Sequence, residues 1–216
     1  MECCDLTHVM HGGMPRFRAY WHCDVSFEQM GRIATEGRNT TRITFGSHAG
    51  THMDAPLHFI DGGTSIDEIP VSLLVGPAMV LDLRDVGPGE PVTAERLARE
   101  TLAERTIVRL GWAEMWEKGD FYSGYPYFSD EAIEHIVSSG TVKLLGMDTP
   151  SPDDSRIACG SPQDSKAHKR LLSAGIVIME YLDMTKVEAF GNWNLAALPL
   201  KLGGCDGSPI RAVLYR

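Results

Sequence analysis

The stretch His48-Ala49-Gly50-Thr51-His52-Met53-Asp54-Ala55-Pro56-Leu57-His58 places three histidines and one aspartate within eleven residues. Residues four positions apart share a face of a helix, so His48 and His52 would be neighbours there. However, Gly50 weakens a helix and Pro56 removes a backbone donor, which favours a segment that leaves a strand and turns. Neutral imidazoles and carboxylates are ligands that zinc and manganese accept. The stretch therefore predicts a metal site in preference to a histidine-rich surface loop.

Two residues in the last third of the chain are further candidates. The sequence predicts a helix over Lys166–Ser173, on which His168 shares a face with two leucines; taken alone, this favours a core histidine over a ligand. Glu180 lies inside the apolar segment 176–182, which predicts a buried strand. An unpaired buried carboxylate is costly, so either a metal or a lysine or arginine partner would have to satisfy Glu180.

The 48–58 stretch resembles the His-x-Gly-Thr-His-x-Asp-x-Pro-x-His motif of the cyclase family of metal-dependent hydrolases, which includes bacterial kynurenine formamidase and isatin hydrolase. All seven fixed positions of the motif are present. Family members also have a downstream histidine followed twelve residues later by a glutamate, and His168 and Glu180 stand at that spacing. The chain further resembles the family in the run Gly146-Met147-Asp148-Thr149-Pro150-Ser151 and in its ending.

The resemblance implies a ligand set and a fold. In it, His48, His52 and Asp54 hold one divalent ion, either Zn²⁺ or Mn²⁺. Asp54 bridges to a second ion held by His168 and Glu180. The resemblance leaves His58 uncoordinated as the acid/base. The implied fold is α/β, with a mixed β-sheet, a barrel-like core of the swivelling β/β/α type and peripheral helices, in a homo-oligomer (dimer or tetramer).

The implied reaction is hydrolysis of an aromatic amide by metal-activated water, with an aryl formamide such as N-formylkynurenine, an intermediate of tryptophan catabolism, as the leading substrate. A cyclic amide such as isatin is the alternative. Many kynurenine formamidases carry a Pro-x-Trp-Pro-Gly stretch where this chain has Met14-Pro15-Arg16-Phe17, so the substrate stays open. Two other classes share the same residue types. His52, Asp54 and His168 could form the triad of a non-haem iron oxygenase, or the metal could be structural in a non-catalytic protein.

Composition limits the remaining function classes. The 216 residues are 43% hydrophobic and 23% charged, which predicts one globular domain over residues 1–216. A net charge of -9 argues against a nucleic-acid partner. No apolar run approaches the ~20 residues of a membrane helix, and the N-terminus lacks the features of a secretory signal. Five cysteines without paired spacing predict reduced thiols and a cytoplasmic protein.

Periodicity and caps predict the outline of the secondary structure. Strands are expected at 40–45 (half-buried), 78–83, 106–110, 142–147, 176–182 and 210–214, and helices at 94–103, 112–118, 129–140 and 166–173. Two aromatic segments, 16–22 and 121–128, could line a substrate pocket or cover a core edge or interface, and the sequence does not choose between these. The three histidines before the motif, His8, His11 and His22, are expected at the surface.

Overall fold

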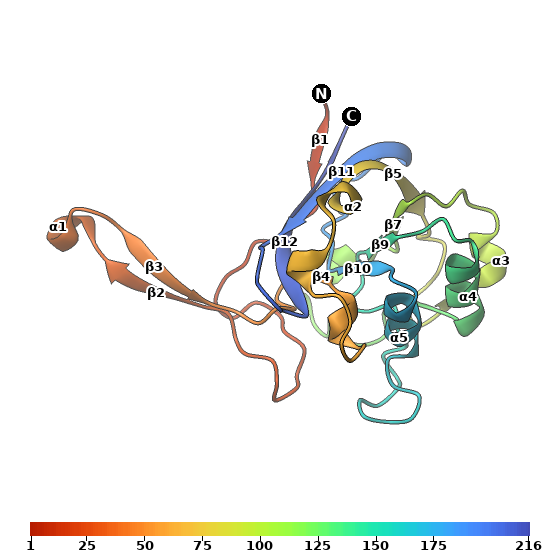
Figure 1. Ribbon diagram of the computed structural model, residues 1–216, viewed down its shortest axis with the longest axis horizontal. Coiled ribbons are helices and arrows are strands. Elements are labelled where there is room, and N and C mark those ends of the chain that lie inside the picture. The colour runs from red at the N-terminus through yellow and green to blue at the C-terminus, as the bar shows by residue number, and fades with distance from the viewer.

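A sheet that closes on itself forms the centre of the molecule, which is described for all 216 residues by a computed structural model (Figure 1). Its strands are β1 (Cys3–Asp5), β4 (His52–Asp54), β5 (Val75–Asp82), β7 (Arg105–Arg109), β9 (Leu144–Met147), β10 (Val177–Glu180), β11 (Gly191–Pro199) and β12 (Gly207–Tyr215). They are ordered β1-β12-β11-β5-β7-β9-β10-β4, and β12 pairs with β4 as well. The strands from β12 round to β4 therefore form a ring, and β1 lies outside it.

The ring is mixed in strand direction. The pairs β5–β7, β7–β9 and β9–β10 are parallel, whereas β11 and β4 each pair antiparallel with both of their neighbours. Strands β7, β9 and β10 are buried along their whole length, as expected for parallel strands covered on both faces. The expected mixed sheet with a barrel-like core and peripheral helices is confirmed.

Alternate residues along the ring strands belong to two different apolar cores. Val80, Ile107 and Met179 belong to one apolar cluster, which also contains residues of β4, β11 and β12. Their strand neighbours, such as Val108 and Ile178, join a second cluster with residues of the outer helices. This alternation follows from the period of two along a strand. The first cluster fills the ring and the second attaches the helices to its outer face.

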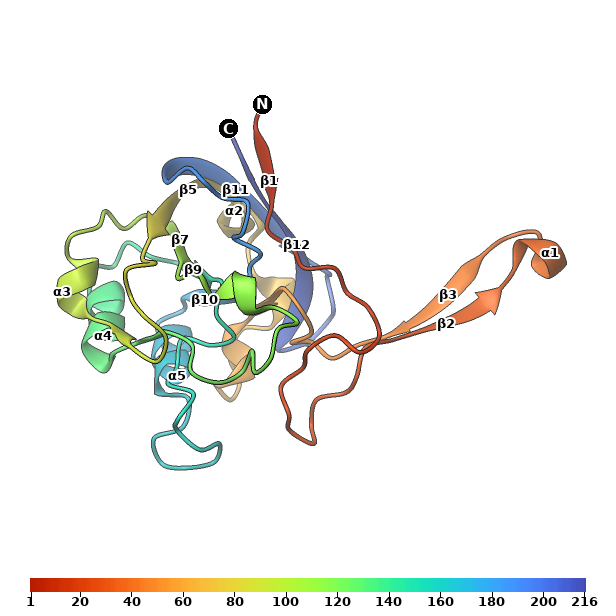
Figure 2. The same cartoon turned by 180° about the vertical axis from the view of Figure 1, so that it is seen from behind.

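The helices are short and lie at the periphery of the ring (Figure 2). The α-helices are α1 (Ile33–Glu36), α2 (Val71–Leu74), α3 (Ala94–Leu97), α4 (Asp130–Ser138) and α5 (Lys166–Ser173). The 3₁₀ turns are η1 (Pro56–His58), η2 (Ile66–Glu68) and η3 (Trp112–Met115). No helix is both long and apolar enough to cross a membrane.

Two helix predictions are confirmed and two are too long. Helix α5 has the predicted bounds, and α4 begins after Ser129, whose hydroxyl accepts the N–H of Ala132. Helix α3 was expected to reach residue 103 but ends at 97. At the expected end of the helix, the backbone of Ala103 instead exchanges hydrogen bonds with the hydroxyl of Thr106, a residue of β7. The segment 112–118 is helical only over η3, because Glu117 has a left-handed φ of 60°.

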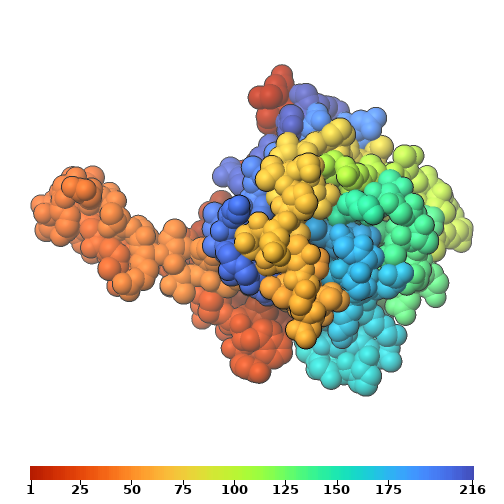
Figure 3. All heavy atoms as spheres, viewed as in Figure 1, coloured from red at the N-terminus to blue at the C-terminus, as the bar shows by residue number.

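A two-stranded arm projects from the ring (Figure 3). It consists of β2 (Ser26–Gly31) and β3 (Thr40–Thr44), with α1 at its tip. The extent of β3 was predicted well, but the expectation that it is half-buried is wrong, since all five of its residues are exposed. The reason is that β3 pairs only with β2, and no second layer lies beneath them. A smaller parallel pair, β6 (Pro91–Val92) with β8 (Tyr127–Phe128), completes the sheets.

Candidate metal centre

The central residues of the motif form β4, one of the strands of the ring. His52 and Asp54 point to one face because side chains alternate along a strand, and Met53 between them is buried in the core on the other. On one side β10 places Glu180 opposite His52, and on the other β12 places Gly207 opposite Asp54. The short strand is therefore flanked by residues from the far end of the chain.

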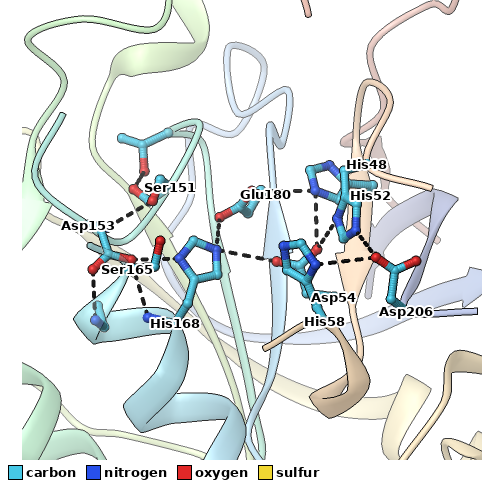
Figure 4. A network of polar contacts seen from close by, with 12 residues as sticks. His48, His52, Asp54, His58, Ser151, Asp153, Ser165, His168, Glu180 and Asp206 are labelled. Carbon is cyan, nitrogen blue, oxygen red and sulfur yellow. Dashed lines mark hydrogen bonds and ion pairs between the residues drawn. The ribbon is translucent and has the colours of Figure 1, made fainter. Parts of the chain in front are cut away.

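The first cluster contains His48, His52 and Asp54 (Figure 4). Nδ1 of His48 lies 2.7 Å from Oδ1 of Asp54, and Nε2 of His52 lies 3.3 Å from the same oxygen. The candidate ligand atoms of the three residues all lie within 4.8 Å of one another, with His52 and Asp54 buried. Two imidazole nitrogens and a carboxylate oxygen form a donor set that suits zinc or manganese.

The second cluster contains Asp54, His168 and Glu180, all buried. Nε2 of His168 lies 3.4 Å from Oδ2 of Asp54 and 3.0 Å from Oε1 of Glu180. Neither of these two carboxylate oxygens accepts a well-formed hydrogen bond, although both are shielded from solvent. Buried polar atoms are rarely left without a partner, so the pair of oxygens fits a cation.

In each of the three histidines of these clusters, one ring nitrogen forms a hydrogen bond with an oxygen that lies outside the two clusters. His52 donates Nδ1–H to the carbonyl of Gly50 over 2.8 Å. His168 donates Nδ1–H to Asp153 over 2.6 Å, and His48 donates Nε2–H to Asp206 over 2.8 Å. With a cation in the cluster, these bonds would keep the proton of each ring on its outer nitrogen and leave the other nitrogen, which faces the cluster, as the ligand. Such outer acceptors are typical of metal-binding histidines.

The electrostatics of the cluster favour bound positive charge. Burial alone would lower the pKa of His48, but the carboxylates of Asp54 and Asp206 outweigh it and raise that pKa to about 10. Burial would raise the pKa of Asp54, yet the neighbouring imidazoles hold it well below its usual range. Burial and the charge of Asp54 together raise the pKa of Glu180. A divalent cation between the two carboxylates would relieve their repulsion.

His58 lies beside the first cluster, at the end of η1. Its ring centre is 3.9 Å from that of His48, and its Nδ1 is 3.3 Å from Oδ2 of Asp206. Its Nε2 makes no hydrogen bond within the protein, and about a quarter of the side chain is exposed. The structure thus gathers all six residues expected at the site.

A cavity of about 480 Å³ opens onto these residues. The aromatic side chains in its wall are Phe17, Trp21, Phe59, Tyr122, Tyr125 and Tyr181. Both aromatic segments of the sequence therefore contribute to a pocket, although Tyr20 is almost fully exposed. Tyr181 follows Glu180 with a left-handed φ of 54°, which ends β10 and sets its ring 5.0 Å from that of His52.

The three histidines before the motif differ from one another. His11 is exposed, as predicted. The surface placement expected for His8 is wrong, because its ring is buried and stacks on Trp116 at 4.4 Å between ring centres. His22 is half-buried and lines the cavity, with its ring 6.2 Å from that of His48. Neither belongs to a group of candidate ligands.

Sequence reasoning missed two carboxylates that hold the histidines, Asp153 and Asp206. Asp153 accepts the N–H groups of Ala167 and His168 at the start of α5 in addition to the His168 ring. Asp206 lies in the glycine-rich turn before β12. Asp206 has a local signal, because it lies in a Gly-Gly-Cys-Asp-Gly turn, but that signal does not indicate which histidine the carboxylate contacts. Asp153 has none, because the loop 154–165 separates it from α5 in the sequence.

Comparison with known proteins places this site in a family. The Cyclase family model matches residues 4–154. The chain belongs to this family. It is 37% identical over 180 residues to a kynurenine formamidase of Bordetella avium (strain 197N), covering 82% of this chain and 80% of the relative. It is 32% identical over 223 residues to a kynurenine formamidase of Paracidovorax citrulli (strain AAC00-1), covering 97% and 94%.

Solved structures extend the likeness to the Cyclase family fold. A potential metal-dependent hydrolase with cyclase activity matches with a TM-score of 0.78 and 26% identity, covering 99% of this chain and 96% of the other. Isatin hydrolase A from Labrenzia aggregata, bound to benzyl benzoate, matches with a TM-score of 0.86 and 25% identity, covering 99% and 93%. The whole length of this chain therefore shares their architecture.

Proposed function

We propose that this Cyclase family chain is a metal-dependent amidohydrolase with two ions per subunit. His48, His52 and Asp54 would hold the first ion, and Asp54, His168 and Glu180 the second. The observation that carries the proposal is the pair of overlapping clusters that share Asp54, with two buried carboxylate oxygens that lack hydrogen-bond donors. The nitrogen and oxygen donors suit Zn²⁺ or Mn²⁺.

The ions would supply the nucleophile and the Lewis acid, because a divalent metal lowers the pKa of a bound water to ~7 and polarises a carbonyl. The protein residues then have two tasks. Asp153, Asp206 and the Gly50 carbonyl keep the histidine rings in the orientation described above. His58, whose Nε2 has no partner within the protein, is placed to accept a proton and to return it to the leaving amine, a role worth ~10²–10⁴-fold in rate.

We propose an aromatic amide as the substrate, with an aryl formamide first and a cyclic aryl amide second. The aromatic wall of the cavity supports a flat ring. The relatives called kynurenine formamidases support an open-chain formamide, and the structural likeness to isatin hydrolase A supports the cyclic alternative. Parallel hydrolysis assays with N-formylkynurenine, formanilide and isatin separate these substrates.

Two other functions account for fewer of the residues. A triad of His52, Asp54 and His168 for non-haem iron would leave His48, His58 and Glu180 at the same site without a role. A purely structural metal would not need His58, whose free ring nitrogen lies next to a cavity. The geometry therefore supports the hydrolase better than either.

The test is metal analysis combined with chelation. The purified protein should contain close to two ions per subunit. Prolonged chelation should abolish hydrolysis of the aryl amide that is turned over, and added zinc or manganese should restore it. Full activity in thoroughly metal-free protein would refute the proposal.

We further propose a homo-oligomer in the cytoplasm. The arm formed by β2 and β3 supports the oligomer, because a two-stranded ribbon alone is marginally stable in water. The arm also exposes about half or more of Phe27, Met30, Ile33 and Ile43. A second copy of the chain would cover these side chains. The five unpaired cysteines are compatible with a reducing compartment.

A further inference from the structure

Asp206 reaches two histidines of the motif at once (Figure 4). Its Oδ2 lies 2.8 Å from Nε2 of His48 and 3.3 Å from Nδ1 of His58. Its backbone carbonyl accepts the N–H of Ala55 over 2.9 Å, which ties the turn before β12 to the end of β4. The carboxylate is therefore held against the motif by main chain as well as by side chains.

The neighbouring residue makes this approach possible. A Cβ on Gly207 would lie 2.9 Å from Cε1 of His48 and 2.8 Å from the carbonyl oxygen of Met53, closer than real side chains come. Only glycine lets β12 pair with β4 while the His48 ring packs over it. The rings of His48 and His58 lie 3.9 Å apart, with an interplanar angle of 31°.

The contact with Asp206 determines where the proton of His58 sits. An ionised carboxylate can only accept hydrogen bonds, so the imidazole must present Nδ1–H to it. A neutral ring with Nδ1–H has its lone pair on Nε2, the nitrogen that makes no hydrogen bond within the protein. Without the carboxylate, the two tautomers of a half-buried imidazole would both be accessible and the ring could rotate.

We propose that Asp206 is a positioning residue that fixes the orientation and tautomer of His58. The inference rests on the proposed function in one respect, namely that His58 is the residue that moves the proton. Asp206 does not touch the substrate in this account. It keeps Nε2 of His58 unprotonated and ready to accept a proton, and it orients His48 through its hydrogen bond to Nε2 of that ring.

A different role for the same three residues is possible on chemical grounds. His48, His58 and Asp206 also lie close enough to hold an ion of their own. In that case Asp206 would be a ligand, and its removal would change the metal content. The experiment therefore measures metal content, tautomer and rate on the same variants.

The test uses Asp206→Asn in the zinc-loaded, full-length protein, with Asp61→Asn as a control that removes an exposed carboxylate just after the motif. Zinc content is measured by mass spectrometry. The tautomer of His58 is read from its ring ¹⁵N shifts, assigned by their absence in His58→Ala. Rates are measured for Asp206→Asn, for His58→Ala and for the double variant.

We expect Asp206→Asn to keep its zinc and to lose about 10–100-fold in kcat, the range for residues that orient site histidines, with little change in KM. The His58 signals should shift from the Nδ1–H tautomer towards a mixture. The double variant should fall well short of the product of the two single losses, because Asp206 affects the rate mainly through His58, while the asparagine can still accept the hydrogen bond from His48. Asp61→Asn should match the parent in all three measurements.

Three results would overturn the proposal. These are an unchanged His58 tautomer in Asp206→Asn, a loss of about one zinc per subunit in that variant, or rate losses that multiply in the double variant. If no aryl amide is hydrolysed, the proposed function fails, but the ¹⁵N measurement still decides whether Asp206 positions His58.

Discussion

The two oxygens of Asp54 face different clusters. Oδ1 lies 2.7 Å from Nδ1 of His48, and Oδ2 lies 3.4 Å from Nε2 of His168. The other carboxylate, Glu180, contacts His52 and His168 from the neighbouring strand. At the scale of single residues the site is therefore asymmetric, because one carboxylate serves both clusters and the other completes one.

This asymmetry predicts that removing Asp54 and removing Glu180 lower the metal content by different amounts. Asp54→Ala should lower metal content at both positions, because it removes the shared ligand, whereas Glu180→Ala should empty mainly one. Metal per subunit, measured after equilibration with limiting zinc, checks this. The two variants losing equal amounts would argue against a bridging Asp54.

His58→Ala should separate catalysis from coordination. The variant should retain near-normal metal and lose ~10²–10⁴ in kcat, since a proton transfer acts only in the transition state. His52→Ala, the matched ligand variant, should lose metal and rate together. Parent-rate turnover of a verified substrate by metal-loaded His58→Ala would remove His58 from the mechanism.

At the scale of elements, α5 lacks the usual cap. Its N-cap residue, Ser165, has a left-handed φ of 54° and makes no capping bond with its side chain. Asp153 supplies the acceptor instead, taking the N–H groups of Ala167 and His168. The carboxylate that starts the helix is thus also the one that orients the His168 ring.

Asp153→Ala should therefore have two effects. Loss of the cap should cost about 1 kcal/mol of stability, and loss of the ring contact should weaken metal binding about 10–100-fold. Denaturant unfolding of the metal-free protein and zinc titration measure them separately. Asp130→Asn, which removes an exposed acid from the first turn of α4, is the control and should leave zinc affinity unchanged.

The exposed apolar side chains of the arm lead us to predict that it forms an interface between subunits. Phe27 and Ile43 are directly opposed on β2 and β3, and both are about half exposed. Changing both to serine should reduce the molar mass in light scattering towards the 23.7 kDa of one chain, whereas Thr41→Ser on the same ribbon should not. A monomeric parent protein, or an unchanged assembly in the double variant, would contradict this.

The sequence predicted elements where local signals agreed with the packing. The cap at Ser129 predicted the start of α4, apolar periodicity predicted α5, and apolar runs predicted the parallel strands. Strand β4 is three residues long, too short for any period, and β11 contains Gly191 and two asparagines that mask its buried alternation of Trp193 and Leu195. Whether β3 is buried depends on whether another layer of the fold covers it, and a local sequence pattern carries no information about that. Motif spacing predicted the candidate ligands. The contacts of Asp153 with His168 and of Asp206 with His48 could not be predicted in this way, because folding brings these residues together from distant parts of the chain.

At the scale of the whole molecule, His8 links stability to pH. Burial against Trp116 lowers the pKa of His8, and the charges of Asp183 and Glu117 offset this only in part. Its Nε2 has no partner. The unfolded chain therefore binds a proton more readily than the folded one, and stability should fall as pH drops below the ordinary histidine value of about 6.5.

His8→Phe should keep the stacking and remove this titration. The difference in unfolding temperature between about pH 8 and about pH 5 should be smaller in the variant than in the parent. His135, a partly buried residue of α4, provides the control, and His135→Phe should leave the difference unchanged. An equal acid loss in His8→Phe and the parent would show that other groups cause it.

The ring closes between two strands that are far apart in the sequence, β4 (His52–Asp54) and β12 (Gly207–Tyr215). A ribosome releases the N-terminal part of a chain first. Strand β4, with His52 and Asp54, is therefore made well before its two neighbours, β10 and β12. The proposed ligands are all present once Glu180 has been made, but the ring closes only when β12 pairs with β4. A chain cut before Asp206 would have every proposed ligand, yet it would lack both the closing strand and the carboxylate that holds His48, so we expect it to bind metal weakly and to be inactive.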